Sequence, residues 1–385
     1  MRATQFCCQV MYRYAHILWF ICTVVGLFSV IRLALYKGGI FSSVSTFGGD
    51  STHYIDGGAS VVPVLCQSKK NIVFLKTHKC ASSTIMNIFL RYGITHNLTF
   101  VLPAIDRTNY IGHPEYFSRN LIKDMRPYNY THNILTHHTR FNKTAIAEVM
   151  PKDTVYVTIL RRPEDMFDSL YHYYAMSSML GKSLAKFVED ETSIRYMANR
   201  KGKKFGFNQM CFDLGADRQN VTNTTGEFID FLEHTFNLIM IAERLDESLV
   251  LLKDLLCWTV EDVVVFKLNA RQSKYKETIS SKAKEKLREC NSADASIYDH
   301  FLQVLDRKVA TFGTERMAQE VDQLRRLRES YSNRCINTTV PVRGNCVLAF
   351  QRKDQSELCR YMTLSELEFH ALIVRRQNQM IQKQG

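Results

Sequence analysis

Four short apolar runs recur along the chain, and each has the length of one buried strand. They are Asn71–Leu75, Asn133–Thr136, Thr154–Leu160 and Leu238–Ala242. Three further segments repeat apolar residues at helical spacing: Ser83–Tyr92, Phe167–Tyr174 and Asp246–Trp258. Strands that alternate with helices predict an α/β fold, with a central parallel sheet flanked by helices.

The last third of the chain has a helical pattern. Apolar residues recur every three or four positions from Ser296 to Tyr331, and Gly313 interrupts the run. A coiled coil is the alternative, but the uneven heptad favours two helices packed on the sheet. Thr363–Gln382 predicts a final helix.

The N-terminal segment Ile17–Tyr36 is long and apolar enough to cross a membrane. Its twenty residues carry one charge, Arg32, close to one end. A cleaved signal peptide would be shorter and would end in a small-residue cleavage site, which is not evident here. We therefore predict a cytosolic tail over 1–16, a transmembrane signal-anchor over 17–36, a flexible Gly/Ser-rich stem over 37–68 and a folded domain over 69–385.

The rest of the chain indicates exposure to a secretory lumen. Six N-x-[ST] sequons follow the apolar segment, at Asn97, Asn129, Asn142, Asn220, Asn223 and Asn337. Eight cysteines also follow it, and an oxidising lumen allows disulfides among them. Spacing does not fix their pairing, although Cys335 and Cys346 are close enough to form a short loop. The pattern is that of a single-pass type II membrane protein with a lumenal domain.

A surplus of positive charge suggests an anionic partner. The formal net charge is +12 and the sequence pI is about 9.1. Nucleic acid, anionic lipid and a phosphorylated small molecule all fit this charge. The apolar anchor and the sequons argue against nucleic acid.

The segment from Lys76 to Thr84 joins a predicted strand to a predicted helix and has the composition of an anion site. It holds two lysines, and hydroxyls gather where the helix begins. Unpaired N–H groups and the positive end of the helix dipole point toward such a loop. The loop contains no glycine, so it is not a Walker A motif, and a magnesium-dependent kinase is disfavoured.

A second phosphate site is indicated further along the chain. Arg161 follows the strand Thr154–Leu160, and Ser169 lies eight residues later in the next helix. A guanidinium and a nearby hydroxyl suit a phosphate monoester. Together with the lysine loop they predict sites for the two ends of a doubly phosphorylated nucleotide.

These segments resemble the galactose-3-O-sulfotransferase family. Asn71–Thr84 is similar to the family's 5′-phosphosulfate loop, and Ile159–Tyr173 is similar to its 3′-phosphate segment. Asp246–Arg271 resembles the branch that acts on galactosylceramide, and the resemblance runs from about Cys66 to Cys359. It implies a P-loop-like sulfotransferase fold, a Golgi membrane location and 3′-phosphoadenylyl sulfate (PAPS) as the sulfo donor.

The resemblance also assigns roles to residues. The 5′-phosphosulfate would be held by Lys76, Thr77, Lys79, Ser82, Ser83 and Thr84, and the 3′-phosphate by Arg161 and Ser169. The family's two histidines fall at His78 and His138. Cys80 and Arg162 depart from the family pattern, where threonine and aspartate are expected.

The implied reaction is sulfation of the 3-hydroxyl of a terminal β-galactose, with galactosylceramide the favoured acceptor. One of the two histidines would act as the base, and Lys79 would stabilise charge on the leaving phosphate. No cluster with metal-ligand spacing occurs in the sequence, so no metal is expected. Glycoprotein galactose, a glycosaminoglycan, or a non-catalytic role in glycan binding remain alternatives, and a homo-oligomer is compatible with the sequence.

Overall fold

The computed structural model describes residues 66–105, 108–200, 203–266, 279–342 and 347–383. The predicted tail and anchor, and all but the last residues of the predicted stem, lie outside these ranges. Within them, no helix is both long and apolar enough to cross a membrane. The described residues belong to one compact unit, Leu65–Gly385.

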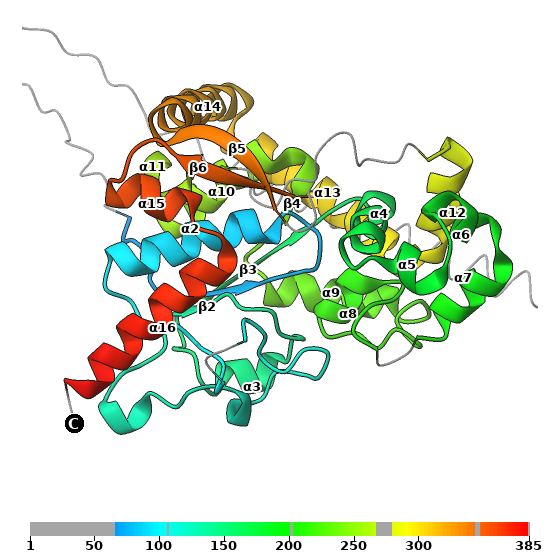
Figure 1. The fold of residues 1–385 in the computed structure, drawn as a ribbon, viewed down its shortest axis with the longest axis horizontal. Helices are drawn as coiled ribbons and strands as arrows, with labels where there is room; N and C mark the ends of the chain where they lie inside the picture. Colours follow the sequence, from blue (N-terminus) through cyan, green and yellow to red (C-terminus); the bar gives the residue numbers. More distant parts are fainter. Residues whose placement is uncertain (1–65, 106–107, 201–202, 267–278, 343–346, 384–385) are drawn as a thin grey trace, which may run out of the picture. The chain divides into compact units, whose positions relative to one another are not determined.

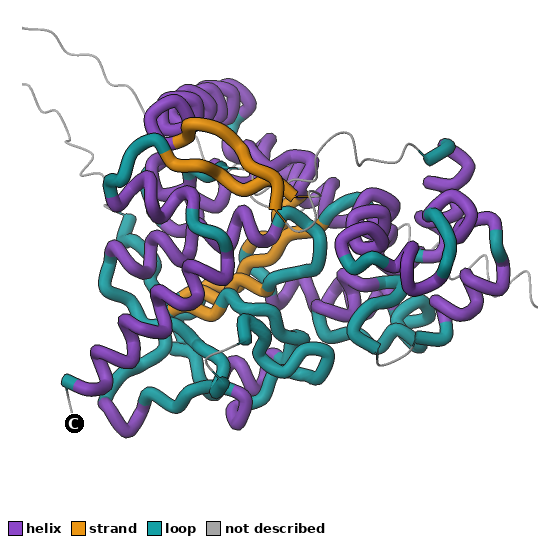
Figure 2. The backbone as a smooth tube through the Cα atoms, in the orientation of Figure 1, coloured by secondary structure: helices purple, strands orange, loops and turns teal. Residues whose placement is uncertain are grey.

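A four-stranded parallel sheet forms the centre of this unit (Figures 1 and 2). Its strands are β1 (Ile72–Leu75), β2 (Ile134–Leu135), β3 (Val155–Leu160) and β4 (Leu238–Ile241), in the order β2-β1-β3-β4. Nearly every strand residue is buried, as expected for a parallel sheet covered on both faces. The predicted parallel α/β sheet is thus confirmed, with boundaries within two residues of those expected.

Helices follow all four strands. They are α2 (Ser82–Thr95) after β1, α3 (Lys143–Ala147) after β2, α4 (Pro163–Tyr173) after β3, and α10 (Leu245–Leu256) with α11 (Val260–Val263) after β4. The helices α2, α4 and α10 match the predicted helical segments, whereas α3 and α11 were not predicted. Pro163 occupies the first turn of α4, where its missing N–H costs no helical hydrogen bond. Short 3₁₀ turns cover Arg119–Leu121, Arg126–Tyr128 and Ala242–Arg244.

A helical insertion between β3 and β4 was not predicted from the sequence. It comprises α5 (Met176–Leu180), α6 (Leu184–Glu189), α7 (Glu191–Ala198), α8 (Gln209–Asp213) and α9 (Thr225–Thr235). Most of these helices have only two turns or fewer, which is too short for a clear 3.6-residue period. Polar caps mark only α6 and α7 among these helices: the Ser183 side chain accepts from a backbone N–H of α6, and the Asp190 carboxylate accepts hydrogen bonds from two backbone N–H groups at the start of α7.

The C-terminal third contains the expected helical pair and one unexpected hairpin. Its helices are α12 (Ser281–Cys290), α13 (Ser292–Phe312), α14 (Thr314–Cys335), α15 (Glu357–Thr363) and α16 (Glu366–Gln382). Gly313 separates α13 from α14 with φ of 98°, a conformation that favours glycine. The hairpin of β5 (Ile336–Val342) and β6 (Val347–Arg352) was missed, because it lies between two strongly helical segments. Figure 1 shows α16 lying beside α2.

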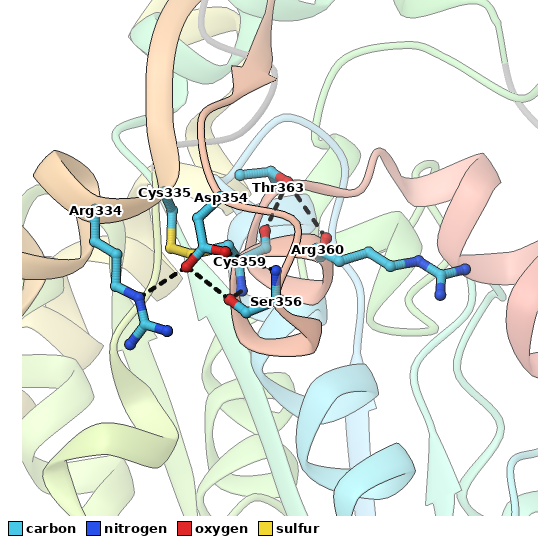
Figure 3. Close-up of a disulfide and its surroundings, with 7 residues drawn as sticks. All are labelled: Arg334, Cys335, Asp354, Ser356, Cys359, Arg360 and Thr363. Atoms are coloured by element: carbon cyan, nitrogen blue, oxygen red, sulfur yellow. Dashed lines mark hydrogen bonds and ion pairs between the residues drawn. A yellow bond between two sulfur atoms is a disulfide. The ribbon is translucent and has the colours of Figure 1, made fainter.

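Two disulfides link distant parts of the described chain: Cys66–Cys257 and Cys335–Cys359. The short loop from Cys335 to Cys346 suggested by spacing is therefore wrong. The hairpin returns the chain to the end of α14, where the Lys353 N–H donates to the Cys335 carbonyl at 2.9 Å. That return brings the start of α15 against α14, so Cys359 reaches Cys335 (Figure 3).

Removing the Cys335–Cys359 disulfide should lower the free energy of unfolding by about 3 kcal/mol, because it closes a loop of 24 residues in the unfolded chain. The variant is Cys335→Ser with Cys359→Ser, compared with the intact protein by urea denaturation without reductant. Cys290→Ser is the control, since Cys290 is an unpaired and only partly buried cysteine. Equal unfolding midpoints for the double variant and the control would contradict this expectation.

Candidate active site

The chain leaves three adjacent strands at one edge of the sheet, and the predicted site residues follow them. Lys76 follows β1, His138 lies three residues after β2, and Arg161 follows β3. Because the carboxyl ends of parallel strands meet at the same edge, these segments converge there, as ligand sites in open α/β sheets do. The Tyr110 segment joins this edge through a parallel bridge to His138.

The loop between β1 and α2 has a backbone suited to an anion. Lys79 and Ala81 both adopt left-handed conformations, with φ of 61° and 60°. Alternation of such residues turns successive N–H groups inward, which a Walker A loop achieves with glycine. The loop leads directly into the N-terminus of α2, whose first N–H groups carry the positive end of the helix dipole.

Two predicted hydroxyls hold this loop in place. The Thr77 hydroxyl donates to the Ile159 carbonyl of β3 at 2.6 Å, and the Ser82 hydroxyl donates to the Thr77 carbonyl at 2.6 Å. Both hydroxyl hydrogens are therefore engaged by backbone carbonyls of the protein. The Thr84 side chain is buried in the first turn of α2.

Lys76 is buried and paired with a residue the sequence reasoning missed. Its ammonium lies 2.5 Å from the carboxylate of Glu366, the first residue of α16. The same carboxylate accepts from Ser83 Oγ at 2.9 Å and Asn109 Nδ2 at 2.7 Å. Burial alone would raise the pKa of Glu366, but Lys76 and these donors lower it to about 2.

Lys79 and Arg161, which were predicted to contact different ends of the nucleotide, are in contact with each other. The Lys79 ammonium is 3.5 Å from the centre of the Tyr173 ring, and Arg161 Nη1 donates to the Lys79 carbonyl at 3.0 Å. Ser169 lies partly buried on α4. No hydrogen bond among the described residues joins Ser169 to Arg161 or to the loop.

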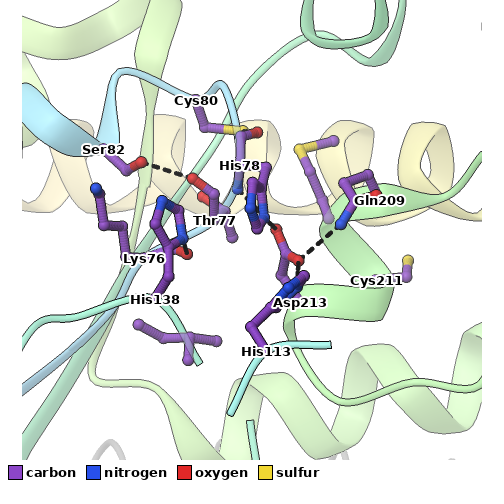
Figure 4. Close-up of polar contacts among 12 residues, drawn as sticks. Lys76, Thr77, His78, Cys80, Ser82, His113, His138, Gln209, Cys211 and Asp213 are labelled. Atoms are coloured by element: carbon purple, nitrogen blue, oxygen red, sulfur yellow. Dashed lines mark hydrogen bonds and ion pairs between the residues drawn. The ribbon is translucent and has the colours of Figure 1, made fainter. Parts of the chain in front are cut away.

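The two histidines expected at the site meet face to face. The rings of His78 and His138 stack with centroids 4.3 Å apart and an interplanar angle of 19° (Figure 4). His138 Nδ1 lies 3.1 Å from the Lys76 carbonyl. Burial, with the nearby Lys76 charge, lowers the pKa of His138 well below 6.5, and burial also lowers the pKa of His78. Both rings are therefore neutral at physiological pH.

A buried carboxylate, Asp213 at the end of α8, lies behind His78. Its Oδ2 accepts from the backbone N–H of His78 at 2.7 Å and lies 2.8 Å from His78 Nδ1. Its Oδ1 lies 3.1 Å from His113 Nε2 and accepts from Gln209 Nε2 at 2.8 Å. Figure 4 shows His78 and His113 on either side of this carboxylate. Burial would raise the pKa of Asp213, but His78 and His113 lower it overall.

Aromatic side chains cover the histidines. The Tyr110 ring stacks on His138 at 5.0 Å, and the Phe205 ring meets His78 edge-on at 5.4 Å. Tyr174 stacks on Phe205 at 3.7 Å. His78 Nε2 is inaccessible to solvent and makes no hydrogen bond within the described chain.

A pocket among the described residues lies away from this site. It has a volume of about 510 Å³, and its lining includes Phe141, Gly215 and Phe231 but neither the loop nor the histidines. The covered histidine site is supported by its polar geometry rather than by an open cavity.

His78, His113 and Asp213 are also close enough together to hold a metal ion, since one nitrogen or oxygen of each lies within 4.8 Å of the others. No ligand spacing revealed this group, because its members are distant in sequence. Each Asp213 oxygen already accepts two N–H donors, which fills the usual lone-pair positions of a carboxylate. That the protein requires no metal stays a prediction.

Sequence reasoning missed three polar residues of the site: His113, Asp213 and Glu366. Each comes from a segment with no recognisable motif. One signal was present for Asp213, a carboxylate between the apolar residues Phe212 and Leu214, since a charge in an apolar run needs a buried partner.

The geometry defines a class of protein. It is an α/β protein with a glycine-free strand-to-helix loop, suited in its backbone to an anion, at the carboxyl edge of a parallel sheet and beside buried histidines. The chain belongs to the galactose-3-O-sulfotransferase family, whose model matches residues 5–376.

Individual proteins that are similar to this chain are named as sulfotransferases. A galactosylceramide sulfotransferase of Homo sapiens is 39% identical over 280 residues, covering 71% of this chain and 65% of the human protein. A galactosylceramide sulfotransferase of Bos taurus is 34% identical over 333 residues, covering 79% and 78%. A galactose-3-O-sulfotransferase 3 of Bos taurus is 36% identical over 274 residues, covering 69% and 63%. The chain thus spans just under two thirds of the human relative.

Among solved structures, a sulfotransferase from Alicyclobacillus acidocaldarius matches with a TM-score of 0.34 and 12% identity. The match covers 62% of this chain and 97% of the bacterial one. A likeness this low carries no argument, so the family assignment rests on sequence.

The Lys76–Glu366 pair predicts a loss of stability in acid. Because the pKa of Glu366 falls from 4.5 to about 2 on folding, its contribution is complete above pH 4.5 and is lost as the pH falls toward 2. Glu366→Gln should be less stable at neutral pH by about 3 kcal/mol, since it leaves Lys76 buried without a counter-charge. The difference from the unmodified chain should shrink in acid.

Urea denaturation at a series of pH values measures this difference. Asp213 also has a lowered pKa and contributes in the same pH range, but it is present in both proteins and cancels in the comparison. Parallel stability curves for the two proteins between pH 4.5 and pH 2 would contradict the expectation.

Proposed function

We propose that the protein transfers a sulfo group from PAPS to the 3-hydroxyl of a terminal β-galactose, with galactosylceramide as the preferred acceptor. The observation that carries the proposal is the neutral, carboxylate-held His78 within an anion-binding loop of a galactose-3-O-sulfotransferase family member. The loop provides for an anionic donor, and the histidine provides for a hydroxyl that must lose its proton.

Membership of a sulfotransferase family implies PAPS as the donor, and the residues of the loop fit that group. In the proposal, backbone N–H groups at the start of α2, Lys79 and Thr84 hold the 5′-phosphosulfate, while Arg161 and Ser169 hold the 3′-phosphate. Ser83 contributes through its backbone N–H, because its hydroxyl donates to Glu366. Thr77 and Ser82 shape the loop, because their hydroxyl hydrogens are taken up by backbone carbonyls. In the proposal, Lys76 does not contact the donor directly. Its ammonium pairs with the Glu366 carboxylate, which accepts from Ser83 at the start of α2.

The reaction needs a base and stabilisation of the leaving group. His78 Nε2 takes the proton of the galactose hydroxyl as its oxygen bonds to sulfur. The bond between sulfur and the bridging phosphate oxygen breaks, and Lys79 stabilises the charge left on that oxygen. His138 orients the acceptor or the sulfo group. Its Nδ1 is directed at the Lys76 carbonyl, so Nε2, on the other side of the ring, is the nitrogen left for that contact.

The proposed location is the Golgi membrane, with the catalytic domain in the lumen. Five sequon asparagines are exposed, as glycosylation requires: Asn97, Asn129, Asn220, Asn223 and Asn337. Asn142 is partly buried and its side chain caps α3. The two disulfides suit an oxidising compartment. The predicted anchor would hold the site close to a glycolipid acceptor in the same membrane.

The proposal is tested by an assay of the purified full-length chain in detergent. The assay measures transfer of labelled sulfate from PAPS. Galactosylceramide, lactosylceramide and N-acetyllactosamine are offered side by side, with and without a metal chelator. We expect label on galactosylceramide in both conditions. Label only on N-acetyllactosamine would indicate that the acceptor is galactose on glycoprotein glycans. No label on any galactoside, with 3′,5′-ADP still bound, would overturn the proposed function.

A further inference from the structure

One buried carboxylate is shared by two histidines at this site. Asp213 is fully buried, and its two oxygens lie 2.8 Å from His78 Nδ1 and 3.1 Å from His113 Nε2. The backbone N–H of His78 and the side chain of Gln209 complete the four contacts. No other buried carboxylate of the described chain contacts the histidine in the anion-binding loop.

These contacts decide where the hydrogens lie. An ionised carboxylate can only accept hydrogen bonds, so the His78 nitrogen facing it must carry the hydrogen. A neutral His78 then has its lone pair on Nε2, the nitrogen on the opposite side of the ring. By the same reasoning, the His113 nitrogen that faces the carboxylate, Nε2, carries a hydrogen, and Nδ1 is its outward nitrogen.

Both of these outward nitrogens are buried without a partner. Within the described chain, His78 Nε2 and His113 Nδ1 are inaccessible to solvent and make no hydrogen bond. Buried polar atoms in folded proteins nearly always have a partner, so an exception points to a ligand. A hydroxyl hydrogen is the group that an imidazole lone pair would accept.

The Asp213 side chain is not the only anchor of α8. Another buried carboxylate, Asp294 of α13, accepts from the backbone N–H groups of Met210 at 3.1 Å and Cys211 at 2.8 Å. That contact anchors the first turn of the helix. The Asp213 carboxylate, at the other end, is directed at the histidines (Figure 4).

We infer that Asp213 is a positioning residue that holds His78 with its hydrogen on Nδ1 and leaves Nε2 as the proton acceptor. The inference rests on the proposed function for the identity of the proton's source, a galactose hydroxyl. When that proton reaches Nε2, His78 becomes an imidazolium, and the Asp213 charge stabilises it. The hydroxyl oxygen keeps its electron pair for the new bond to sulfur, and the S–O electron pair leaves with the phosphate.

The tautomer is measured directly, without any assay of activity. Nitrogen-15 spectra of the histidine-labelled full-length chain in detergent distinguish the two neutral forms, and the His78→Asn variant assigns the signal. We expect hydrogen on Nδ1 of His78. Hydrogen on Nε2 would overturn the inference, even if the protein proves to be an active sulfotransferase.

Asp213→Asn tests the consequence for turnover. We expect kcat to fall by about 10²- to 10⁴-fold, with affinity for 3′,5′-ADP unchanged within about threefold. Because the Asp213 charge favours the protonated form of His78, its removal should also move the acid limb of the kcat/KM profile to lower pH. A merely structural loss would lower activity without moving that limb.

Asp294→Asn is the matched control, since Asp294 is equally buried, also contacts α8, and touches no histidine. Its kcat should stay within about threefold of the unmodified chain. An Asp213→Asn variant that keeps its kcat, or that loses it with an unmoved acid limb, would overturn the inference. If that variant does not fold, the tautomer of the unmodified chain decides. Absence of sulfate transfer by the unmodified chain would instead overturn the proposed function.

Discussion

Replacing Lys79 by alanine is expected to abolish sulfate transfer, with a loss in kcat of about 10²- to 10³-fold or more, while the protein still folds. In the proposed reaction its ammonium stabilises the charge that develops on the leaving phosphate, and losing one such group costs about 3–4 kcal/mol of transition-state stabilisation. The side chain is only partly buried and packs on the Tyr173 ring, so the core is untouched.

Two variants make this result specific. Lys70→Ala removes a lysine that is exposed just before β1, and it should leave kcat unchanged. Lys79→Arg keeps the charge but changes its shape and reach, so an intermediate activity is expected. Sulfate transfer is measured at saturating PAPS, with folding checked by circular dichroism. Normal turnover by Lys79→Ala would eliminate the proposed role of the loop.

Replacing His78 by asparagine is expected to lower kcat by about 10²- to 10⁴-fold, because it removes the proton acceptor. Asparagine can still donate a side-chain N–H to Asp213 in place of Nδ1, so the buried carboxylate keeps a partner. Affinity for 3′,5′-ADP should therefore change little. The loss should appear in kcat rather than in nucleotide binding.

His138→Asn is the matched variant. It can keep the hydrogen bond to the Lys76 carbonyl while removing the other ring nitrogen. Since His138 has no carboxylate behind it in the described chain, we expect a smaller loss in kcat than for His78→Asn. The acid limb of the kcat/KM profile, which should lie below pH 6.5 because burial lowers the pKa of His78, should persist in His138→Asn. A larger loss for His138→Asn would exchange the proposed roles.

The sequence predicted the parts of the fold that depend on local pattern. The strands of the sheet, the helices after β1 and β3, and the break at Gly313 all follow from residues within a few positions of one another. The short helices of the insertion and the β5–β6 hairpin escaped prediction because their stability comes from caps and distant contacts. The pairing of Cys335 with Cys359 likewise depended on how the hairpin returns the chain.

At the candidate site, the sequence by itself determined the loop between β1 and α2 with its lysines, because a strand, a loop and a helix that follow one another create that loop locally. That the loop binds an anion stays a prediction. The sequence also placed His78 and His138 at the same edge of the sheet. Only the tertiary structure decided their partners: Asp213 lies 135 positions from His78, and Glu366 lies 290 positions from Lys76. A buried charge or imidazole needs a partner wherever the fold can provide one, and the residues next to it in sequence do not identify that partner.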